Sequence, residues 1–250
     1  GISPFSIDII DQFNINVSPF DVKQGGFAGG AINAVTRRGT NEIGGSAYYF
    51  FRNQDFAGKT PTDDKNIDRK KLSDFTSQTY GVRVGGPIVK NKLFYFFNVE
   101  IQRDNSPQPF DYETYANNLG AGRAATRDDI AALTQKVGGY GYDIGGYESS
   151  DRKLDGEKFF LRLDWNINDV HKFTIRHNYT NGKQLSPGRS SASTLTFGNK
   201  GLDFSSKTNA TTAELKSLFG NKAANSLLIG VNLVRDNRDP IGNPFPSVFI

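Results

Sequence analysis

The sequence predicts an all-β protein: a partial antiparallel transmembrane β-barrel of about seven strands, preceded by a small globular unit. Segments after residue 40 alternate apolar and polar side chains with a period of two, which is the periodicity of strands. The connections between these segments are alternately short and long. The chain also contains 20 Phe, 10 Tyr and 27 Gly, a composition that favours strands and tight turns over helices.

Each strand candidate has one mainly apolar and one mainly polar face. The candidates are residues 43–53, 76–86, 93–102, 158–167, 172–179, 207–219 and 223–235. In the clearest one, Leu93, Tyr95, Phe97, Val99 and Ile101 alternate with a second set that includes Asn98, Glu100 and Gln102. About ten residues of this kind are the length that a tilted strand needs to cross a membrane. Residues 236–250 are expected to form a proline-rich loop.

Connection lengths distinguish a barrel from a soluble sandwich. The short connections are residues 87–91, 168–171 and 220–222, and the long ones are 54–75, 104–156 and 183–206. An outer-membrane barrel has short periplasmic turns and longer external loops, which fits this alternation. A soluble β-sandwich adhesion module fits the alternating faces but not the one-sided loop lengths.

One helix is expected inside the longest connection. Thr126 and Asp129 have the spacing of a helix N-cap, and Gly138 can end the helix. Ile130, Leu133 and Val137 would then share an apolar face.

Bacterial single-chain barrels have even strand numbers, and an open edge in hydrocarbon leaves backbone groups unsatisfied. We therefore expect further strands to follow Ile250 in a longer parent protein. The absence of methionine, even at position 1, agrees with a chain that is a piece or has been processed.

Charge and composition exclude several classes. The net charge is only +4, and the basic residues are interleaved with acidic ones, which argues against nucleic-acid binding. No run of 18 apolar residues is present, so a transmembrane helix is not expected. The lack of cysteine excludes disulfides and thiolate metal sites.

The first 40 residues differ from the rest, with short apolar pieces and clustered glycines at Gly25, Gly26, Gly29 and Gly30. A phosphate-binding loop would need a Gly-Lys-Ser/Thr ending or a strand before and a helix after, and neither is present. Tight turns and close packing are the favoured role of these glycines. We assign residues 1–40 to the C-terminal part of a plug and residues 41–250 to the first part of the barrel.

The stretch Val17–Asn53, VSPFDVKQGGFAGGAINAVTRRGTNEIGGSAYYFFRN, resembles the end of the plug and the first barrel strand of TonB-dependent outer-membrane receptors. Its segment Gly29–Arg37 is the part most typical of that superfamily. Gly81–Glu100 and Lys158–Lys183 are similar to the Oar-like subgroup.

The resemblance implies import of a bulky ligand across the outer membrane of a Gram-negative cell, through a plugged barrel of about 22 strands. It implies contact with the TonB energy-transducing complex through a box upstream of this chain, which begins inside the plug. Outer-membrane lipids, an unknown ligand and a lipoprotein are the other expected partners, with no nucleic acid and no cofactor. The alternative is a barrel that serves as a structural platform for lipoprotein or secretion partners, without energised import.

Catalysis is not expected. The two histidines, His171 in a turn and His177 on an outward face, lack a carboxylate at metal-ligand spacing, and there is no cysteine nucleophile. We therefore predict no enzyme and no catalytic, cofactor or metal residues. Four carboxylates of the longest loop could hold calcium, although solvated loop charge is the favoured alternative: Asp143, Glu148, Asp151 and Asp155.

The predicted site is the junction of plug and barrel. On the plug side it comprises Gly25, Gly26, Gly29, Gly30, Asn33, Thr36, Arg37 and Arg38. The candidate partners in the lumen are Arg83, Glu100, Arg162, Asp164 and Arg176. Arg37 and Arg38 could pair with a lumen carboxylate such as Glu100 or Asp164 and hold the plug, or could simply be solvated beside a turn.

Overall fold

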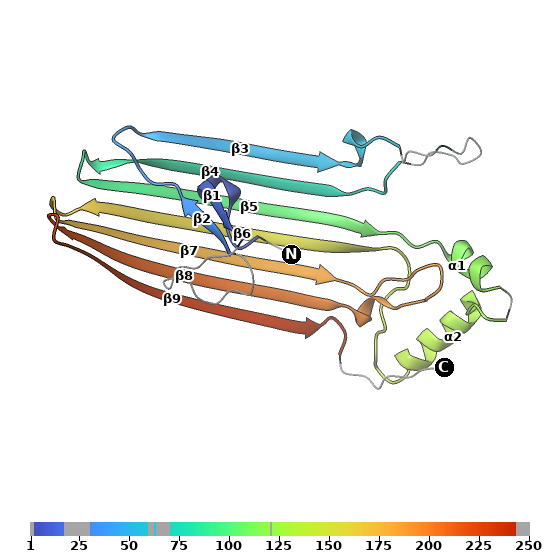
Figure 1. The fold of residues 1–250 in the computed structure, drawn as a ribbon. Coiled ribbons are helices and arrows are strands. Elements are labelled where there is room, and N and C mark those ends of the chain that lie inside the picture. The colour runs from blue at the N-terminus through green and yellow to red at the C-terminus, as the bar shows by residue number, and fades with distance from the viewer. Residues whose placement is uncertain (1–2, 18–30, 60–62, 64–70, 121, 244–250) are drawn as a thin grey trace.

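The computed structural model describes residues 3–17, 31–59, 63, 71–120 and 122–243 and consists mainly of two antiparallel sheets (Figure 1). The larger sheet has seven strands in the order β3-β4-β5-β6-β7-β8-β9, so each strand pairs with its neighbour in sequence. A two-stranded ribbon of β1 and β2 lies over this sheet in Figure 1. The predicted all-β antiparallel fold is confirmed.

The strands of the large sheet are long. The bounds are β1 Ile10–Asn16, β2 Ala31–Thr36, β3 Gly44–Asn53, β4 Thr76–Val89, β5 Leu93–Gln108, β6 Ser150–Asn166, β7 His171–Ser186, β8 Leu202–Phe219 and β9 Ala223–Pro240. Both β8 and β9 have 18 residues, which is roughly 59 Å at 3.3 Å per residue. Because about ten residues suffice to cross a membrane, these strands continue well beyond it.

The predicted strands were too short at the end with the long connections. β5 continues to Gln108, β6 already begins at Ser150, and β9 ends at Pro240, inside the segment expected to be a loop. Backbone pairing continues through these extensions, where Gln108 lies opposite Ser150 and Leu202 opposite Pro240. Their side chains are mostly polar on both faces, so the apolar alternation stops before the strand does.

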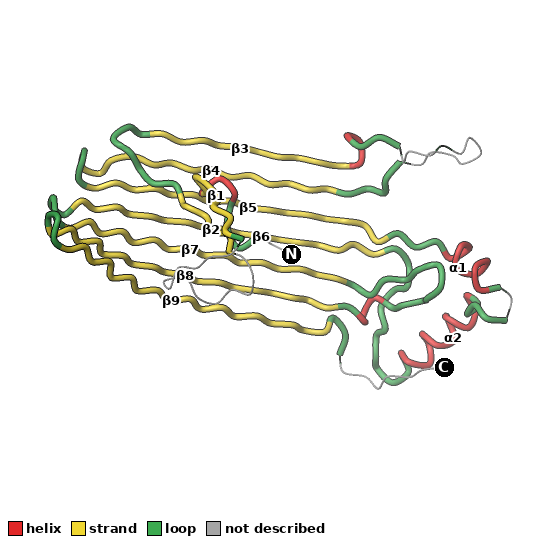
Figure 2. The backbone as a smooth tube through the Cα atoms, viewed as in Figure 1, coloured by secondary structure: helices red, strands yellow, loops and turns green. Residues whose placement is uncertain are grey.

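Three short turns lie at one end of the sheet, at residues 90–92, 167–170 and 220–222, and the long connections lie at the other (Figure 2). Asn91 and Gly220 occupy left-handed backbone positions in two of these turns, with φ of 61° and 57°. The side chain of Asn41, just before β3, exchanges two hydrogen bonds of 2.5 and 2.7 Å with Asn91. The start of β3 is therefore tied to the β4–β5 turn.

The connection between β5 and β6 contains α1 (Tyr112–Leu119) and α2 (Arg127–Gly138). In α2, the Thr126 hydroxyl accepts a hydrogen bond from the Asp129 backbone N–H, and the Asp129 carboxylate accepts from the Thr126 backbone N–H and hydroxyl. These hydrogen bonds lower the pKa of Asp129 below its ordinary value. The helix and its cap are as predicted.

The apolar face predicted for α2 is only partly covered, because Ile130 is buried but Leu133 is 41% exposed. α1 was not predicted; it has eight residues, and its start is capped by Asp111. No helix in the described ranges is long and apolar enough to span a membrane. Short 3₁₀ turns occur at Ile7–Ile9, Gln54–Phe56 and Gly198–Lys200.

Aromatic contacts connect the two helices with the β7–β8 connection. Tyr147 lies edge-on to both Phe110 and Phe197, with ring centroids 6.2 and 6.3 Å apart. The Arg127 guanidinium lies 4.0 Å from the ring centroid of Tyr112, a cation–π contact. The β5–β6 and β7–β8 connections thus form a folded layer beyond the strand ends (Figure 1).

Candidate functional site

The N-terminal unit, comprising residues 3–17 and 31–40, packs against one face of the large sheet, which we call the inner face. Ile9 and Ile10 of this unit form a buried cluster with Phe96 of β5 and Phe160 of β6. The two phenylalanine rings meet edge to face with centroids 6.1 Å apart. The sequence pattern predicts a polar lumen, and this apolar patch was not predicted. The sequence does contain a sign of the patch, because both phenylalanines occupy positions on the otherwise polar face of their strands.

A buried polar cluster lies beside the apolar patch. Lys158 Nζ is 2.6 Å from Glu100 Oε1, and the two side chains are only 6% and 10% exposed. The other carboxylate oxygen of Glu100 accepts a hydrogen bond of 2.7 Å from the Ser6 hydroxyl and one from Tyr48. Glu100 therefore joins the wall of the sheet to the N-terminal unit.

Tyr48 reaches Glu100 by lying across the backbone of Gly81 on the neighbouring strand. A Cβ atom at Gly81 would be 2.5 Å from the phenol Cζ and hydroxyl atoms of Tyr48. Only glycine leaves room for this ring.

An ion pair links the N-terminal unit to β3 and β4. Arg83 Nε is 3.0 Å from Asp8 Oδ2, and the side chains are 25% and 23% exposed. Ser46 Oγ lies between them, donating to Asp8 over 3.0 Å and accepting from Arg83 over 2.8 Å. Among the described residues, this is the ion pair that joins the unit to the sheet.

The end of β2 is held by Arg162. Its Nη1 atom donates to the Thr36 backbone carbonyl and hydroxyl over 2.8 and 2.9 Å. The same guanidinium makes a two-pronged contact with Asp164, with distances of 2.8 and 2.9 Å. Thr180 and Asn178 of β7 donate to the Pro4 carbonyl over 2.6 and 3.1 Å. At Arg162, neutral groups of the unit therefore meet a wall charge that already has a partner.

The expected pairing of Arg37 or Arg38 with a lumen carboxylate is not the arrangement that the structure has. Arg37 lies 3.9 Å from Asp11, inside the N-terminal unit. Glu100 and Asp164 are instead neutralised from the wall itself, by Lys158 and Arg162. A carboxylate that already has a cation at hydrogen-bonding distance gains little from a second one.

The other predicted residues have different positions. Arg176 faces the unit and lines a cavity of about 310 Å³ with Phe5 and Ile9. Asn33 is exposed on β2, where it lies opposite Asn14, and Arg38 is also exposed. The predicted glycines Gly25, Gly26, Gly29 and Gly30 lie outside the described residues.

The loop carboxylates are dispersed. Asp155 lies 3.7 Å from Arg103, Glu148 lies 3.9 Å from Arg127, and Asp151 accepts a hydrogen bond from Asn105. Asp143 accepts from the backbone of its own turn. Within the described ranges, no three His, Asp or Glu side chains gather as metal ligands would.

The two histidines contact hydroxyl groups of β8. His171 Nδ1 is 2.8 Å from Ser217 Oγ, and His177 Nδ1 is 2.8 Å from Thr211 Oγ1. Each therefore has a neutral cross-strand partner and no carboxylate at this nitrogen.

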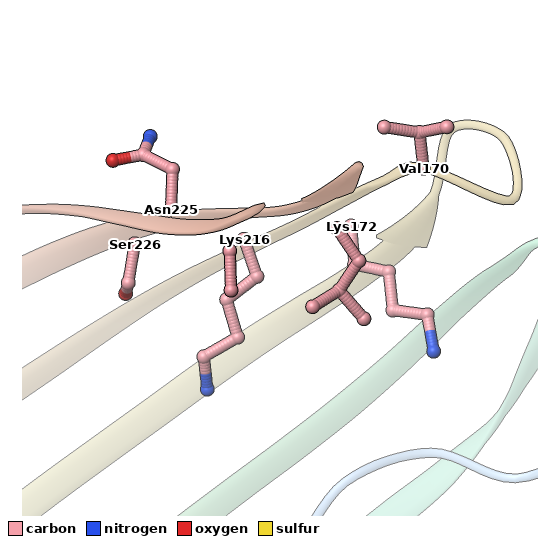
Figure 3. Close-up of a pocket in the computed structure, with 7 residues that line it drawn as sticks. Val170, Lys172, Lys216, Asn225 and Ser226 are labelled. Carbon is pink, nitrogen blue, oxygen red and sulfur yellow. The ribbon is translucent and has the colours of Figure 1, made fainter. Parts of the chain in front are cut away.

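A second cavity, of about 390 Å³, lies at the end of the sheet with the short turns (Figure 3). Lys172 of β7 and Lys216 of β8 line it, together with Ser226 of β9. The two lysine side chains extend to the same side in Figure 3, and Lys216 also lies 3.1 Å from Glu214. Of the two lysines, Lys216 is thus paired with a carboxylate of its own strand.

Comparison with known proteins gives a consistent assignment. Residues 35–143 match a family described as an outer membrane beta barrel domain. Over 105 residues the chain is 35% identical to the TonB-dependent transporter Oar of Myxococcus xanthus; the match covers 38% of this chain and 9% of that protein. No solved structure matches significantly. Together with the seven-stranded antiparallel sheet, these similarities support an outer-membrane β-barrel chain that resembles a fragment of a TonB-dependent receptor.

Proposed function

We propose that the protein imports a bulky ligand through a barrel whose lumen is closed by a plug, and that the N-terminal unit is the C-terminal part of this plug. The long connections capture the ligand outside the cell. Displacement of the plug then opens a path along the inner face of the sheet.

The distribution of charge at the interface carries this proposal. Glu100 and Asp164 keep their wall partners Lys158 and Arg162 whether or not the unit is present. The unit adds neutral hydrogen bonds from Ser6 and to the Thr36 carbonyl. If the unit moves, water replaces these neutral groups. The Asp8–Arg83 pair must separate, but both of its side chains are already partly exposed, so displacement leaves no fully buried charge unpaired among the described residues.

Energy for this movement would come from the TonB complex, reached through a segment outside this chain. The Myxococcus xanthus relative is a TonB-dependent transporter, which supports this partner. We expect cells that express the protein to deplete specific compounds from the medium, measured by untargeted mass spectrometry. That depletion should disappear when the TonB complex is removed.

A reversible cross-link tests the plug movement directly. The side-chain oxygens of Asp8 and Ser46 are 3.0 Å apart, and the chain contains no cysteine that could compete. In the variant with Asp8→Cys and Ser46→Cys, oxidation should stop ligand depletion and reduction should restore it. The reduced double variant is the matched control for the lost Asp8–Arg83 pair. Equal depletion by the oxidised and reduced forms would exclude displacement of this unit.

The alternative is an outer-membrane platform for a lipoprotein or secretion partner. The folded layer formed by α1, α2 and the β7–β8 connection favours it, because it presents exposed groups such as Tyr140 at 76% exposure. Two results together would support the platform instead. Compounds would still be depleted after loss of the TonB complex, and a partner would co-purify only when α1 and α2 are present.

A further inference from the structure

A cavity lies between the N-terminal unit and the inner face of the large sheet. Its volume of about 310 Å³ is at the lower end of the range for small-molecule pockets. Both parts of the protein line it, with Phe5, Ile9 and Ile10 from the unit and Phe160, Arg176 and Thr212 from the sheet. A molecule in this cavity therefore contacts the unit and the wall at the same time.

The lining of this cavity has an apolar part and a polar part. Ile9, Ile10 and Phe160 are only 3–6% exposed and belong to one buried cluster. The polar part lies on β7 and β8, where Arg176 and Thr212 are direct cross-strand neighbours. A ligand that fits both parts has an apolar body and one polar end.

Arg176 is the charged residue among those that line the cavity, and it is half-buried. No ion pair between described residues includes it. Its direct cross-strand neighbour on β6 is another cation, Arg162. Like charges in directly opposite positions are destabilising, so an anion beside Arg176 would stabilise this part of the wall.

Two acidic residues are diagonal neighbours of Arg176 on the inner face, and both already have partners. Asp164 of β6 accepts two hydrogen bonds from Arg162, of 2.8 and 2.9 Å. Glu214 of β8 lies 3.1 Å from Lys216 on its own strand. An anion in the cavity would therefore neutralise a cation that has no carboxylate of its own among the described residues.

We propose that this cavity binds a small carboxylate with an apolar body, such as a short-chain acid that carries an aryl or alkyl group. The carboxylate accepts charge-assisted hydrogen bonds from Arg176, whose planar guanidinium matches it in geometry. The apolar body lies between Ile9 of the unit and Phe160 of β6. Burial of that body favours this class of ligand over phosphate, which would leave the apolar lining uncovered. This binding does not depend on import by the barrel.

Binding is measured by isothermal titration calorimetry on the full-length protein in detergent, with protein-free detergent as the blank. The probe is 4-phenylbutanoate. It is compared with 4-phenylbutanamide, which lacks the charge, and with acetate, which lacks the apolar body. Arg176→Gln removes the cation, and Ala210→Leu fills the cavity from β8 while it keeps Arg176. The matched control is Arg238→Gln, which removes the same charge from β9 outside the cavity.

Loss of the charge-assisted hydrogen bonds should weaken binding of 4-phenylbutanoate by about 10- to 150-fold in Arg176→Gln. Ala210→Leu should also bind it more weakly, because the added side chain occupies the space of the apolar body. The Arg238→Gln variant should bind as the wild type does, and the amide and acetate should bind weakly to all forms. In the wild type the bound acid should slow hydrogen exchange in residues 5–10, since it contacts the unit as well as the wall.

Equal binding of the acid and the amide by the wild type, or no saturable binding of the acid, would overturn the proposal. Undiminished binding by Arg176→Gln, or an equal loss in Arg238→Gln, would do the same. If Arg176→Gln does not fold, Arg176→Lys replaces it. That variant keeps the charge without the planar fork, so it should still prefer the acid to the amide but bind the acid more weakly than the wild type. Wild-type affinity in both Arg176→Lys and Ala210→Leu would count against the site.

Discussion

Replacing Lys158 with Met removes the cation of the buried cluster and leaves the Glu100 carboxylate without it. Both side chains are at most 10% exposed, so water cannot replace the lysine while the N-terminal unit covers the site. Breaking a buried pair by removing one partner costs about 3–5 kcal/mol. This penalty is avoided when Ser6 moves away from the Glu100 carboxylate and water hydrates it. The loss should therefore appear as detachment of the unit before the sheet unfolds.

A free-energy change of that size shifts the balance between attached and detached forms by roughly 200- to 5,000-fold. The full-length Lys158→Met protein should show raised basal conductance in planar bilayers. Adding Glu100→Gln restores a neutral group that still accepts hydrogen bonds from Ser6 and Tyr48, so the double variant should regain most of the attachment. Wild-type conductance in Lys158→Met, or equal leakage in the double variant, would refute the reasoning.

Three further predictions concern single positions. Gly81→Ala should push Tyr48 away from the buried cluster, because the added Cβ would be 2.5 Å from the phenol ring, and lower stability by about 1–3 kcal/mol in denaturant titrations. Asp8→Asn breaks a partly exposed ion pair and should cost less than about 1 kcal/mol, seen as faster hydrogen exchange in residues 5–15 with an unchanged sheet. Thr126→Ala should speed exchange in α2 at neutral pH. In the wild type, the cap's contribution is present above the ordinary carboxyl pKa and is lost as pH falls through the lowered pKa of Asp129.

The membrane-crossing part of each strand could be predicted because lipid on one side and the lumen on the other impose alternation. Leu93, Tyr95 and Phe97 of β5 show it in the sequence, and the register places them on the outer face. The extensions to Gln108 and Pro240 could not be predicted in this way, since backbone pairing holds them and water meets both faces. The helix α2 could be predicted from its cap, whereas α1 is too short to show a pattern.

The region of the site could be predicted from the sequence, but the partner of each charged residue could not. Glu100, Arg83 and Arg162 were named for facing a plug, and each of them contacts the N-terminal unit. Which charges pair depends on neighbours across strands, and sequence spacing does not fix that register. Lys158 lies opposite Glu100 only because β5 and β6 pair through a connection of about forty residues. Arg37 was therefore assigned a carboxylate that the wall already neutralises.

The order of the strands also bears on how the molecule assembles. Every pairing in the large sheet joins neighbours in sequence, and three of them close through turns of three or four residues. Hairpins of this kind form quickly, because little chain entropy is lost in closing them. The contacts of the N-terminal unit are the opposite: Ser6 meets Glu100 across 94 residues, and Pro4 meets Thr180 across 176. The N-terminal unit is synthesised before the wall, so it docks only after the last of its partner strands has been made.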